Sequence, residues 1–452
     1  MADLADYSAK VSEMQCLSHE GEVDRMSGSV VEARGPSVGV GQLCDIYAES
    51  EAGRETIKAE VVGFEGETII LMPLEKLNGV QPGDTVRAAD HSLQVRVGEK
   101  LLGRVLDGLG RPMDGGDRVV CPHSLPIYND APHPLERSRI EEPFHTGVRA
   151  IDLPVTLGKG QRVGIFAGPG LGKSTLLAQM ARGSRADVNV IALIGERGRE
   201  VKAFIDDCLG SKGLKKSVVV VATADVPPLL KVKAAFTSTA IAEYFRDRGM
   251  HVLYLMDSLT RVADSQREVG LAGGEPPTTR GYPPSVFSLI PSLTERLGCG
   301  AEGTITGLYA VLVEQDELND PLAEAVRASL DGHIVLSRSL AERGHYPAID
   351  VLKSVSRTFP AVTDPRHREV VKELKAVLST YREAEELIKM GAYNRGSDPE
   401  TDRALDLMPE INDYLQQDMN ETASYQEARH ELESIISREE TENMEEARGA
   451  LR

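Results

Sequence analysis

The sequence predicts an α/β protein whose central domain holds a mostly parallel sheet, with a small β-barrel before it and a helical domain after it. Three observations predict this architecture. Short β-rich runs cut by turn residues fill the N-terminal part, near-continuous apolar runs alternate with amphipathic segments in the middle, and strand signals end at about residue 365. Continuous apolar runs are typical of parallel strands covered on both faces. The 452 residues suffice for roughly two or three domains.

The barrel is expected over residues 25–96. Runs such as 28–33, 60–64 and 68–72 are rich in β-formers, and Gly-Glu, Asn-Gly and Pro-Gly steps separate them. Several short strands at this spacing favour a closed antiparallel barrel over loosely attached hairpins, because their apolar residues need a common core. The acidic residues 1–24 form a separate leading segment.

The nucleotide-binding domain is expected over residues 97–365. Its first part is a connection rich in glycine and proline, and the predicted strands follow it at 162–166, 188–194, 217–222, 251–256 and 304–313. The helical domain is expected over residues 366–452, because apolar residues there recur at heptad-like spacing. Its last stretch is strongly charged and reads as an exposed helix or tail.

Residues 167–174 form a glycine-rich loop between a predicted strand and a predicted helix, which is the context of a phosphate-binding P-loop. Its glycines let backbone N–H groups surround phosphate oxygens, Lys173 supplies a positive charge, and the Ser174 hydroxyl can bind Mg²⁺. The expected contacts are Gly168, Pro169, Gly170, Leu171, Gly172, Lys173, Ser174 and Thr175. The first motif position is Ala167 instead of glycine. The sequence therefore predicts a nucleoside triphosphate site.

Two further strands end in acidic residues. Asp257 follows the apolar run 251–256, and beyond a P-loop such an aspartate is the expected second Mg²⁺ ligand, although a strand-ending aspartate can also be a simple cap. Glu196 and Arg197 follow the run 188–194. A carboxylate near the terminal phosphate can orient water and an arginine can bind phosphate, whereas the alternative is a surface salt-bridge cluster.

The bulk composition excludes several classes of function. The net charge of −19 and the absence of tryptophan argue against nucleic acid as a partner. The five cysteines are scattered and form no Cys-x-x-Cys pair, as expected for structural thiols in a reducing compartment. The N-terminus lacks the apolar segment of a signal peptide, and no apolar run is long enough to span a bilayer. We expect a cytoplasmic protein.

Several longer motifs indicate a family. They are Leu-Gly-Arg-Val-Leu-Asp-Gly-Leu-Gly-Arg-Pro at 102–112, Thr-Gly-Val-Arg-Ala-Ile-Asp at 146–152, Met-Asp-Ser-Leu-Thr-Arg at 256–261, the glycine- and proline-rich stretch at 274–287, Leu-Asp-Gly-His-Ile-Val-Leu-Ser-Arg at 330–338, and His-Tyr-Pro-Ala-Ile-Asp at 345–350. Through them nearly the whole chain resembles the catalytic subunits of the rotary ATPase superfamily and, within it, the type III protein-export ATPases of flagella and injectisomes. The resemblance implies a RecA-like nucleotide-binding domain.

The resemblance also implies roles for individual residues. Lys173 matches the P-loop lysine, Ser174 and Asp257 match the Mg²⁺ ligands, Glu196 matches the glutamate that activates water, and Arg197 and Arg261 match arginines near the phosphates. Arg357 resembles the arginine finger that enters the neighbouring subunit's site, Tyr346 matches the tyrosine that packs on adenine, and Tyr425 is expected to form the other wall of that pocket. Without the family, Tyr346 could be a core tyrosine and Arg357 part of a structural ion pair.

The resemblance implies an Mg²⁺-dependent ATPase, a homohexamer that energises type III protein export, releasing chaperones and feeding unfolded substrates to the export gate. Its expected partners are stator and central stalk proteins, chaperone–substrate complexes and the membrane export gate, at which it would be peripheral; residues 1–24 would bind one of these partners. The flagellar system is favoured over the injectisome. The alternatives are a rotary ATP synthase subunit, a nucleic-acid translocase, which the acidic charge opposes, and a nucleotide-binding scaffold without turnover.

Overall fold

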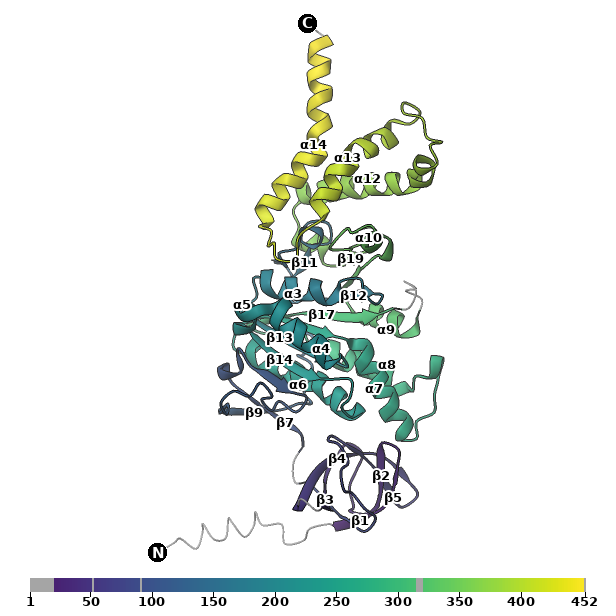
Figure 1. Cartoon of the computed structure of the whole chain (residues 1–452). Helices are drawn as coiled ribbons and strands as arrows, with labels where there is room; N and C mark the ends of the chain where they lie inside the picture. The colour runs from purple at the N-terminus through teal and green to yellow at the C-terminus, as the bar shows by residue number, and fades with distance from the viewer. Residues whose placement is uncertain (1–19, 51–52, 90–91, 314–319, 451–452) are drawn as a thin grey trace, which may run out of the picture. The chain divides into compact units, whose positions relative to one another are not determined.

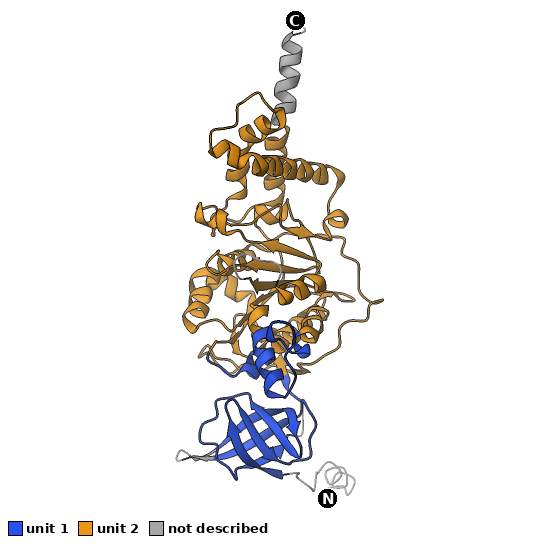
Figure 2. Ribbon diagram, turned by 90° about the vertical axis from the view of Figure 1, so that its right-hand side faces the viewer, with its two compact units in different colours: residues 1–94, 225–233, 263–286 blue, residues 95–224, 234–262, 287–452 orange. Residues whose placement is uncertain are grey.

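The computed structural model describes residues 20–50, 53–89, 92–313 and 320–450, and describes side chains outside 49–54 and 438–452 (Figure 1). Most of the predicted leading segment, together with Cys16, therefore lies outside the described residues. The chain divides into two compact units, one of residues 1–94, 225–233 and 263–286 and one of the remaining residues (Figure 2). The domain boundaries expected from the sequence stay predictions.

The first unit contains the predicted barrel, a closed sheet in the order β1-β2-β5-β4-β3-β6. Its strands are β1 (Glu20–Ser27), β2 (Val30–Arg34), β3 (Leu43–Ser50), β4 (Gly53–Glu65), β5 (Thr68–Pro73) and β6 (Thr85–Ala88). Apolar side chains such as Val31, Ile46, Ile57 and Leu71 fill the interior. The period-2 alternation of the strands thus produces one common core, as predicted.

Two interactions attach later parts of the chain to the barrel within this unit. Lys233 donates a hydrogen bond to Glu60 at 2.7 Å, and both side chains are buried. Burial raises the pKa of Glu60, and the ammonium of Lys233 opposes that rise. Gly63 also approaches Gly273 so closely that a Cβ on Gly63 would lie 2.5 Å from the Gly273 carbonyl oxygen.

The second unit is built around a nine-stranded sheet in the order β19-β18-β12-β17-β15-β13-β14-β8, with β16 paired to β17. The strands are β8 (Val105–Asp107), β12 (Arg162–Ala167), β13 (Val188–Ile194), β14 (Ser217–Ala222), β15 (His251–Asp257), β16 (Gly298–Cys299), β17 (Thr304–Leu312), β18 (Gly332–Val335) and β19 (Val355–Ser356). From β18 to β8 every neighbouring pair is parallel. All residues of β13 and β14 are buried. This agrees with their continuous apolar sequences, because a parallel sheet is covered on both faces.

Short elements connect and flank this sheet. The helices are α2 (Arg149–Asp152), α3 (Lys173–Gly183), α4 (Gly198–Ala203), α5 (Gly210–Lys215), α6 (Pro228–Arg246), α7 (Leu259–Ala272), α8 (Pro284–Thr294), α9 (Pro321–Ser329), α10 (Arg338–Glu342) and α11 (Phe359–Val362). The remaining strands are β7 (Gln94–Val97), β9 (His123–Pro126), β10 (Pro143–Phe144) and β11 (Leu157–Gly158). Because β12, β13 and β15 run in the same direction, their carboxyl ends meet at one edge of the sheet, where ligands bind in such folds.

The C-terminal part consists of the helices α12 (Pro365–Lys389), α13 (Pro399–Leu415) and α14 (Tyr425–Ala450), as predicted. Asp364 caps α12 by accepting from the His367 N–H, and it also forms a two-pronged ion pair with Arg429 on α14. These contacts lower the pKa of Asp364 to about 2. Apolar residues of the three helices belong to the same buried cluster as the central sheet.

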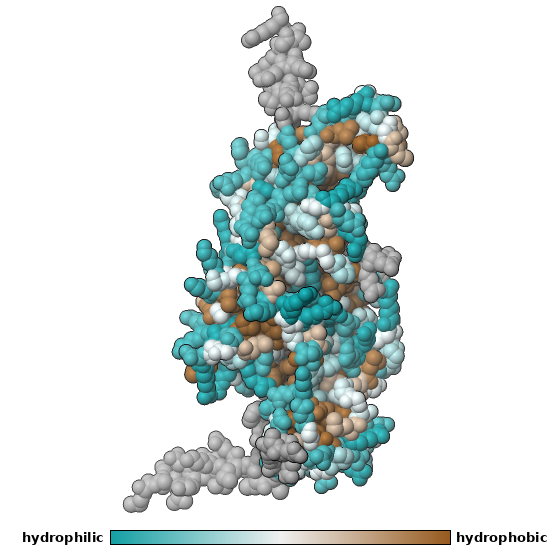
Figure 3. Space-filling view, viewed as in Figure 1, coloured by the Kyte–Doolittle hydropathy of each residue, from teal (hydrophilic) through white to brown (hydrophobic). Residues whose placement is uncertain are grey.

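No helix among the described residues is long and apolar enough to cross a membrane. The face of the molecule visible in Figure 3 carries many hydrophilic residues with hydrophobic ones between them.

Candidate nucleotide-binding site

The glycine-rich loop joins the end of β12 to the start of α3 and needs its glycines. Gly170 and Gly172 have φ angles of 79° and 84°, in the left-handed region that side-chain-bearing residues avoid. A Cβ on Gly172 would also lie 3.6 Å from the Tyr346 ring. Ala167 is fully buried as the last residue of β12, so the departure at the first motif position does not alter the loop. The loop and the first turn of α3 present backbone N–H groups of the kind that bind phosphate.

Lys173, Ser174 and Asp257 come together at the carboxyl ends of β12 and β15. The Lys173 ammonium contacts one Asp257 carboxylate oxygen, and the Ser174 hydroxyl donates to the other at 3.1 Å. Lys173 and Asp257 are both buried, so each compensates the charge of the other. A carboxylate and a hydroxyl side by side are hard oxygen donors. Such donors suit a divalent cation whose remaining ligands are water molecules and phosphate oxygens.

Glu196 lies beyond the end of β13, near this group. Partial burial raises the pKa of Glu196 to about 7, and the negative charge of Asp257 and a hydrogen bond to Glu200 add to the rise. A carboxyl group with a pKa near neutrality is suited to accept a proton from water. The structure therefore places Glu196 within the electrostatic reach of both Asp257 and Lys173.

The two arginines near Glu196 differ in their surroundings. Arg197 is exposed, and its guanidinium donates to Glu200 at 3.2 Å. Arg261, at the start of α7, packs its aliphatic stem against the backbone of Gly195, where an added Cβ would lie 2.6 Å from the Arg261 Cβ. Because Gly195 also has a φ angle of 76°, glycine is required for the turn that presents Glu196.

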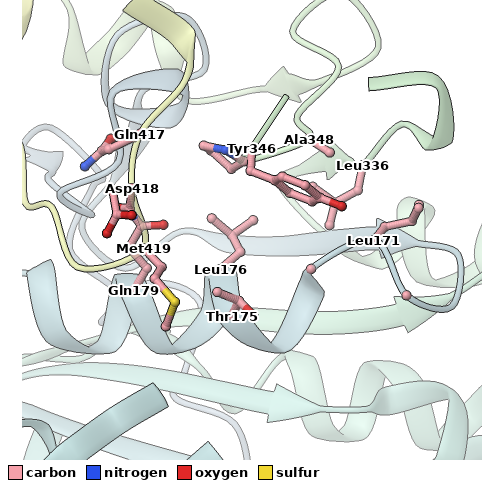
Figure 4. A pocket seen from close by; sticks show the side chains of 13 residues that line it. Leu171, Thr175, Leu176, Gln179, Leu336, Tyr346, Ala348, Gln417, Asp418 and Met419 are labelled. Carbon is pink, nitrogen blue, oxygen red and sulfur yellow. The ribbon is translucent and has the colours of Figure 1, made fainter. Parts of the chain in front are cut away.

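A cavity of about 420 Å³ adjoins the P-loop and α3 (Figure 4). Gly170, Leu171, Gly172, Thr175, Leu176, Gln179, Leu336, Tyr346, Pro347, Ala348, Gln417, Asp418 and Met419 line it. Figure 4 shows the Tyr346 ring extending across the cavity above α3. A mostly apolar cavity with an aromatic ring, next to a phosphate loop, is suited to hold the base of a nucleotide.

The wall opposite Tyr346 consists of residues 417–419, which the sequence did not predict. Gln417 holds this wall in place: its N–H donates to the Tyr346 carbonyl at 2.9 Å, and its side chain donates to the Gly147 carbonyl at 2.8 Å. Gln179 of α3 donates to the Asp418 carbonyl at 3.2 Å. The only signal in the sequence was the position of this segment after the helix that ends at Leu415.

Tyr425 does not line this cavity, contrary to expectation. A hydrogen bond of 3.0 Å joins its hydroxyl to His367, and its ring centroid lies 4.3 Å from that of His145. Tyr425 is the first residue of α14, and the intervening loop, not the helix, forms the wall. The structure gives Tyr425 a packing position between the nucleotide domain and the C-terminal helices.

Arg357 is a predicted site residue that the structure keeps far from the P-loop. It directly follows β19, whose neighbour β18 pairs with β12, and the Arg357 N–H donates to the Asp331 carbonyl at 2.9 Å. Asp331 in turn bonds to Arg162, the first residue of β12, whereas the P-loop follows the last. The strand separates the two positions by roughly 20 Å. Arg357 is exposed, and within the described part of the chain no acidic side chain pairs with its guanidinium.

Comparisons with known proteins cover almost the whole chain. Residues 23–89 match the beta-barrel domain of the ATP synthase alpha/beta family, residues 147–356 match the nucleotide-binding domain of that family, and residues 363–434 match the T3SS EscN ATPase C-terminal domain. The three matched regions follow one another in the order of the barrel, the central sheet and the C-terminal helices.

Individual relatives are similar along their full length. The chain is 50% identical over 423 residues to the flagellum-specific ATP synthase of Bacillus subtilis, covering 93% of this chain and 96% of that protein. It is 48% identical over 415 residues to the type 3 secretion system ATPase of Xanthomonas euvesicatoria, covering 92% and 93%. Among solved structures, the assembled ATPase EscN in complex with its central stalk EscO, from the enteropathogenic E. coli type III secretion system, matches with a TM-score of 0.84 and 43% identity, covering 92% of this chain and 100% of that one.

Proposed function

We propose that this chain, which belongs to the ATP synthase alpha/beta family and within it to the type III protein-export ATPases, hydrolyses ATP as a ring of six identical subunits to energise the export of flagellar proteins. The observation that carries the proposal is the division of the site. Four residues gather at the carboxyl ends of the parallel strands: Lys173, Ser174, Glu196 and Asp257. Arg357 lies near the opposite, amino-terminal ends of these strands. One chain thus supplies both halves of a site that forms between neighbours.

In this proposal the P-loop backbone and Lys173 hold the phosphates of ATP, and Ser174 and Asp257 hold Mg²⁺. Mg²⁺ bound there would neutralise negative charge on the phosphate groups. The contact between Lys173 and Asp257 keeps the two buried charges paired until ATP binds and its phosphate becomes the partner of the Lys173 ammonium. Glu196 orients a water molecule and accepts its proton as the water oxygen bonds to the γ-phosphorus and ADP leaves. We assign Arg197 and Arg261 to phosphate oxygens as further contacts.

Arg357 completes the site of the next subunit. Arg357 is too far from the P-loop of its own subunit to reach a nucleotide bound there. Because its guanidinium is exposed, it can instead contact the γ-phosphate bound to a neighbouring subunit. An arginine supplied in this way stabilises the charge that develops on the transferred phosphoryl group. Hydrolysis then requires assembly, and a ring is the closed arrangement that head-to-tail contacts produce.

The flagellar system is our main assignment, and the injectisome is the second candidate. Similarity to the flagellum-specific protein of Bacillus subtilis supports the first, and the match to the EscN C-terminal domain and to EscN itself supports the second. In either system we propose a central stalk protein, a stator, chaperone–substrate complexes and the membrane export gate as partners, with the protein peripheral to the cytoplasmic membrane. The stalk proposal is supported by the EscN–EscO complex.

The size of the purified chain in the presence of a non-hydrolysable ATP analogue tests this function. We expect a ring of this chain alone, because each subunit carries both Glu196 and Arg357. Light scattering after size-exclusion chromatography measures the mass. Failure to self-assemble with any nucleotide would favour an ion-translocating synthase subunit that needs non-identical partners. Secretion of filament protein or of needle protein by the source bacterium, with and without an active copy of the chain, separates the two export systems.

Replacing Tyr346 tests the base pocket. We expect Tyr346→Ala to weaken ATP binding by about 1–3 kcal/mol, because the ring is positioned to stack on the base, and Tyr346→Phe to retain the affinity. Titration with a fluorescent ATP analogue measures the dissociation constant. Tyr425→Phe is the matched control, since Tyr425 lies outside the cavity and its hydroxyl bonds to His367 and Arg429, away from the cavity lining. Equal weakening by Tyr425→Phe and Tyr346→Ala would contradict the assignment.

A further inference from the structure

We infer that Gln161 is a positioning residue for Arg357, holding the finger that one subunit extends into the site of the next. The inference rests on the proposed function, because it requires that Arg357 acts on a neighbouring subunit. Gln161 is fully buried and directly precedes β12, the strand that ends at the P-loop. A buried amide at the start of this strand has no part in binding the chain's own nucleotide, which lies at the other end.

The Gln161 side chain bonds to the residues on both sides of Arg357. Its carbonyl oxygen accepts from the Thr358 hydroxyl at 2.6 Å, and its amide nitrogen donates to the Ser356 hydroxyl at 3.1 Å. The two hydroxyls are 3.2 Å apart, so the three side chains form a closed group. Arg357 therefore projects from a segment whose two flanking residues are fixed to one buried amide.

Asp331 fixes the backbone of Arg357 itself. Its carbonyl oxygen accepts from the Arg357 N–H at 2.9 Å and from the Gln161 amide at 2.9 Å, while its carboxylate accepts from the Arg162 N–H at 3.1 Å and the Arg162 Nε at 3.0 Å. The amide of Gln161 also accepts from the Gly158 N–H at 2.9 Å, so all of its hydrogen-bonding capacity is used.

This support adds to the pairing of β19 with β18, which holds the backbone before Arg357. The Arg357 guanidinium is exposed and has no acidic partner in the described part of the chain, so the direction of the side chain depends on where its backbone is held. A displacement of about 1 Å in a catalytic group can cost roughly 10²-fold in rate. A leucine at position 161 would keep the bulk and remove every polar contact to Ser356, Thr358 and Asp331.

Mixed rings test the inference in the assembled protein. One subunit type carries Arg357→Ala and so has an intact site without a finger, and the other carries Glu196→Gln and so has a finger without an active site. We expect the mixture to hydrolyse ATP. Adding Gln161→Leu to the Glu196→Gln subunit should reduce this recovered rate about 10²-fold, because that subunit supplies the finger. Adding Gln161→Leu to the Arg357→Ala subunit should leave the rate unchanged.

The outcomes separate the two proposals. If the first mixture does not recover activity, the shared site is wrong and the role of Gln161 falls with it. Suppose that the first mixture recovers activity, but that Gln161→Leu lowers the rate equally in both subunit types or has no effect in either. In that case only the role of Gln161 is overturned. Loss confined to the subunit with the intact site would place the action of Gln161 on its own P-loop instead.

A second variant avoids a change in the core. Ser356→Ala together with Thr358→Val removes the two hydroxyls bonded to Gln161, and in the finger-supplying subunit it should lower the recovered rate in the same direction by a smaller factor. Ser329→Ala, which removes a hydroxyl bonded only within α9, is the matched control and should have no effect. If Gln161→Leu fails to enter rings, the hydroxyl variant alone decides, and an unchanged recovered rate for it would overturn the inference.

Discussion

Replacement of Glu196 by glutamine is expected to lower the rate of ATP hydrolysis by about 10²–10⁴-fold while ATP still binds. Burial and the charge of Asp257 raise the pKa of Glu196 to about 7, which gives this carboxylate the basicity to accept a proton from water. Glutamine has nearly the same size but cannot accept that proton. Steady-state hydrolysis and titration with an ATP analogue together measure the two effects.

The control for this substitution is Glu369→Gln. Glu369 is an exposed residue of α12 paired with Arg366, and its replacement should leave hydrolysis unchanged. Retention of the full hydrolysis rate by Glu196→Gln would support the alternative of a nucleotide-binding scaffold in which this glutamate is a surface residue. Loss of ATP binding together with hydrolysis would place Glu196 in the binding of substrate instead of in its turnover.

Replacement of Arg357 by alanine is expected to lower hydrolysis by roughly 10³–10⁵-fold, the range found for arginine fingers. The affinity of each subunit for ATP should change little, because Arg357 lies at the end of the sheet remote from its own P-loop. Hydrolysis, ring size and ATP affinity are measured on the same preparation. Arg357→Lys should not restore the rate, since an ammonium cannot bind two phosphate oxygens in a fork.

The control for Arg357 is Arg395→Ala. Arg395 is an exposed arginine that pairs with Asp406 in the C-terminal helices, so its loss removes the same charge from a different place. We expect normal hydrolysis from it. A large loss of ATP affinity in Arg357→Ala subunits, measured before assembly, would mean that the residue serves its own site.

Much of the fold could be predicted because its signals are local. The turn residues between short strands predicted the barrel, the apolar runs ending at Ile194 and Met256 predicted buried parallel strands, and the glycines before Lys173 predicted the phosphate loop. In each case one stretch of chain contains both the element and the reason for it. The grouping of Lys173, Ser174 and Asp257 followed from the rule that parallel strands end at the same edge.

The parts that could not be predicted depend on contacts between distant stretches. The wall formed by residues 417–419 is a loop without an aromatic residue, and its place beside Tyr346 follows from hydrogen bonds to Gly147 and Gln179. The family resemblance implied Tyr425 as the other wall, yet Tyr425 packs against His145 and His367. The hydrogen bonds of Gln161 to Ser356 and Thr358 likewise could not be predicted, because Gln161 belongs to no motif that indicates these partners.

The division of the site between identical subunits is tested most directly by mixing the two inactive proteins, Glu196→Gln and Arg357→Ala, and measuring ATP hydrolysis against the mixing ratio. In an equimolar ring each interface pairs an intact site with an intact finger in one case of four, so the mixture should recover roughly a quarter of the wild-type rate. Each protein alone should stay inactive. A mixture that remains inactive at every ratio, although mixed rings form, would show that Glu196 and Arg357 do not act together across an interface.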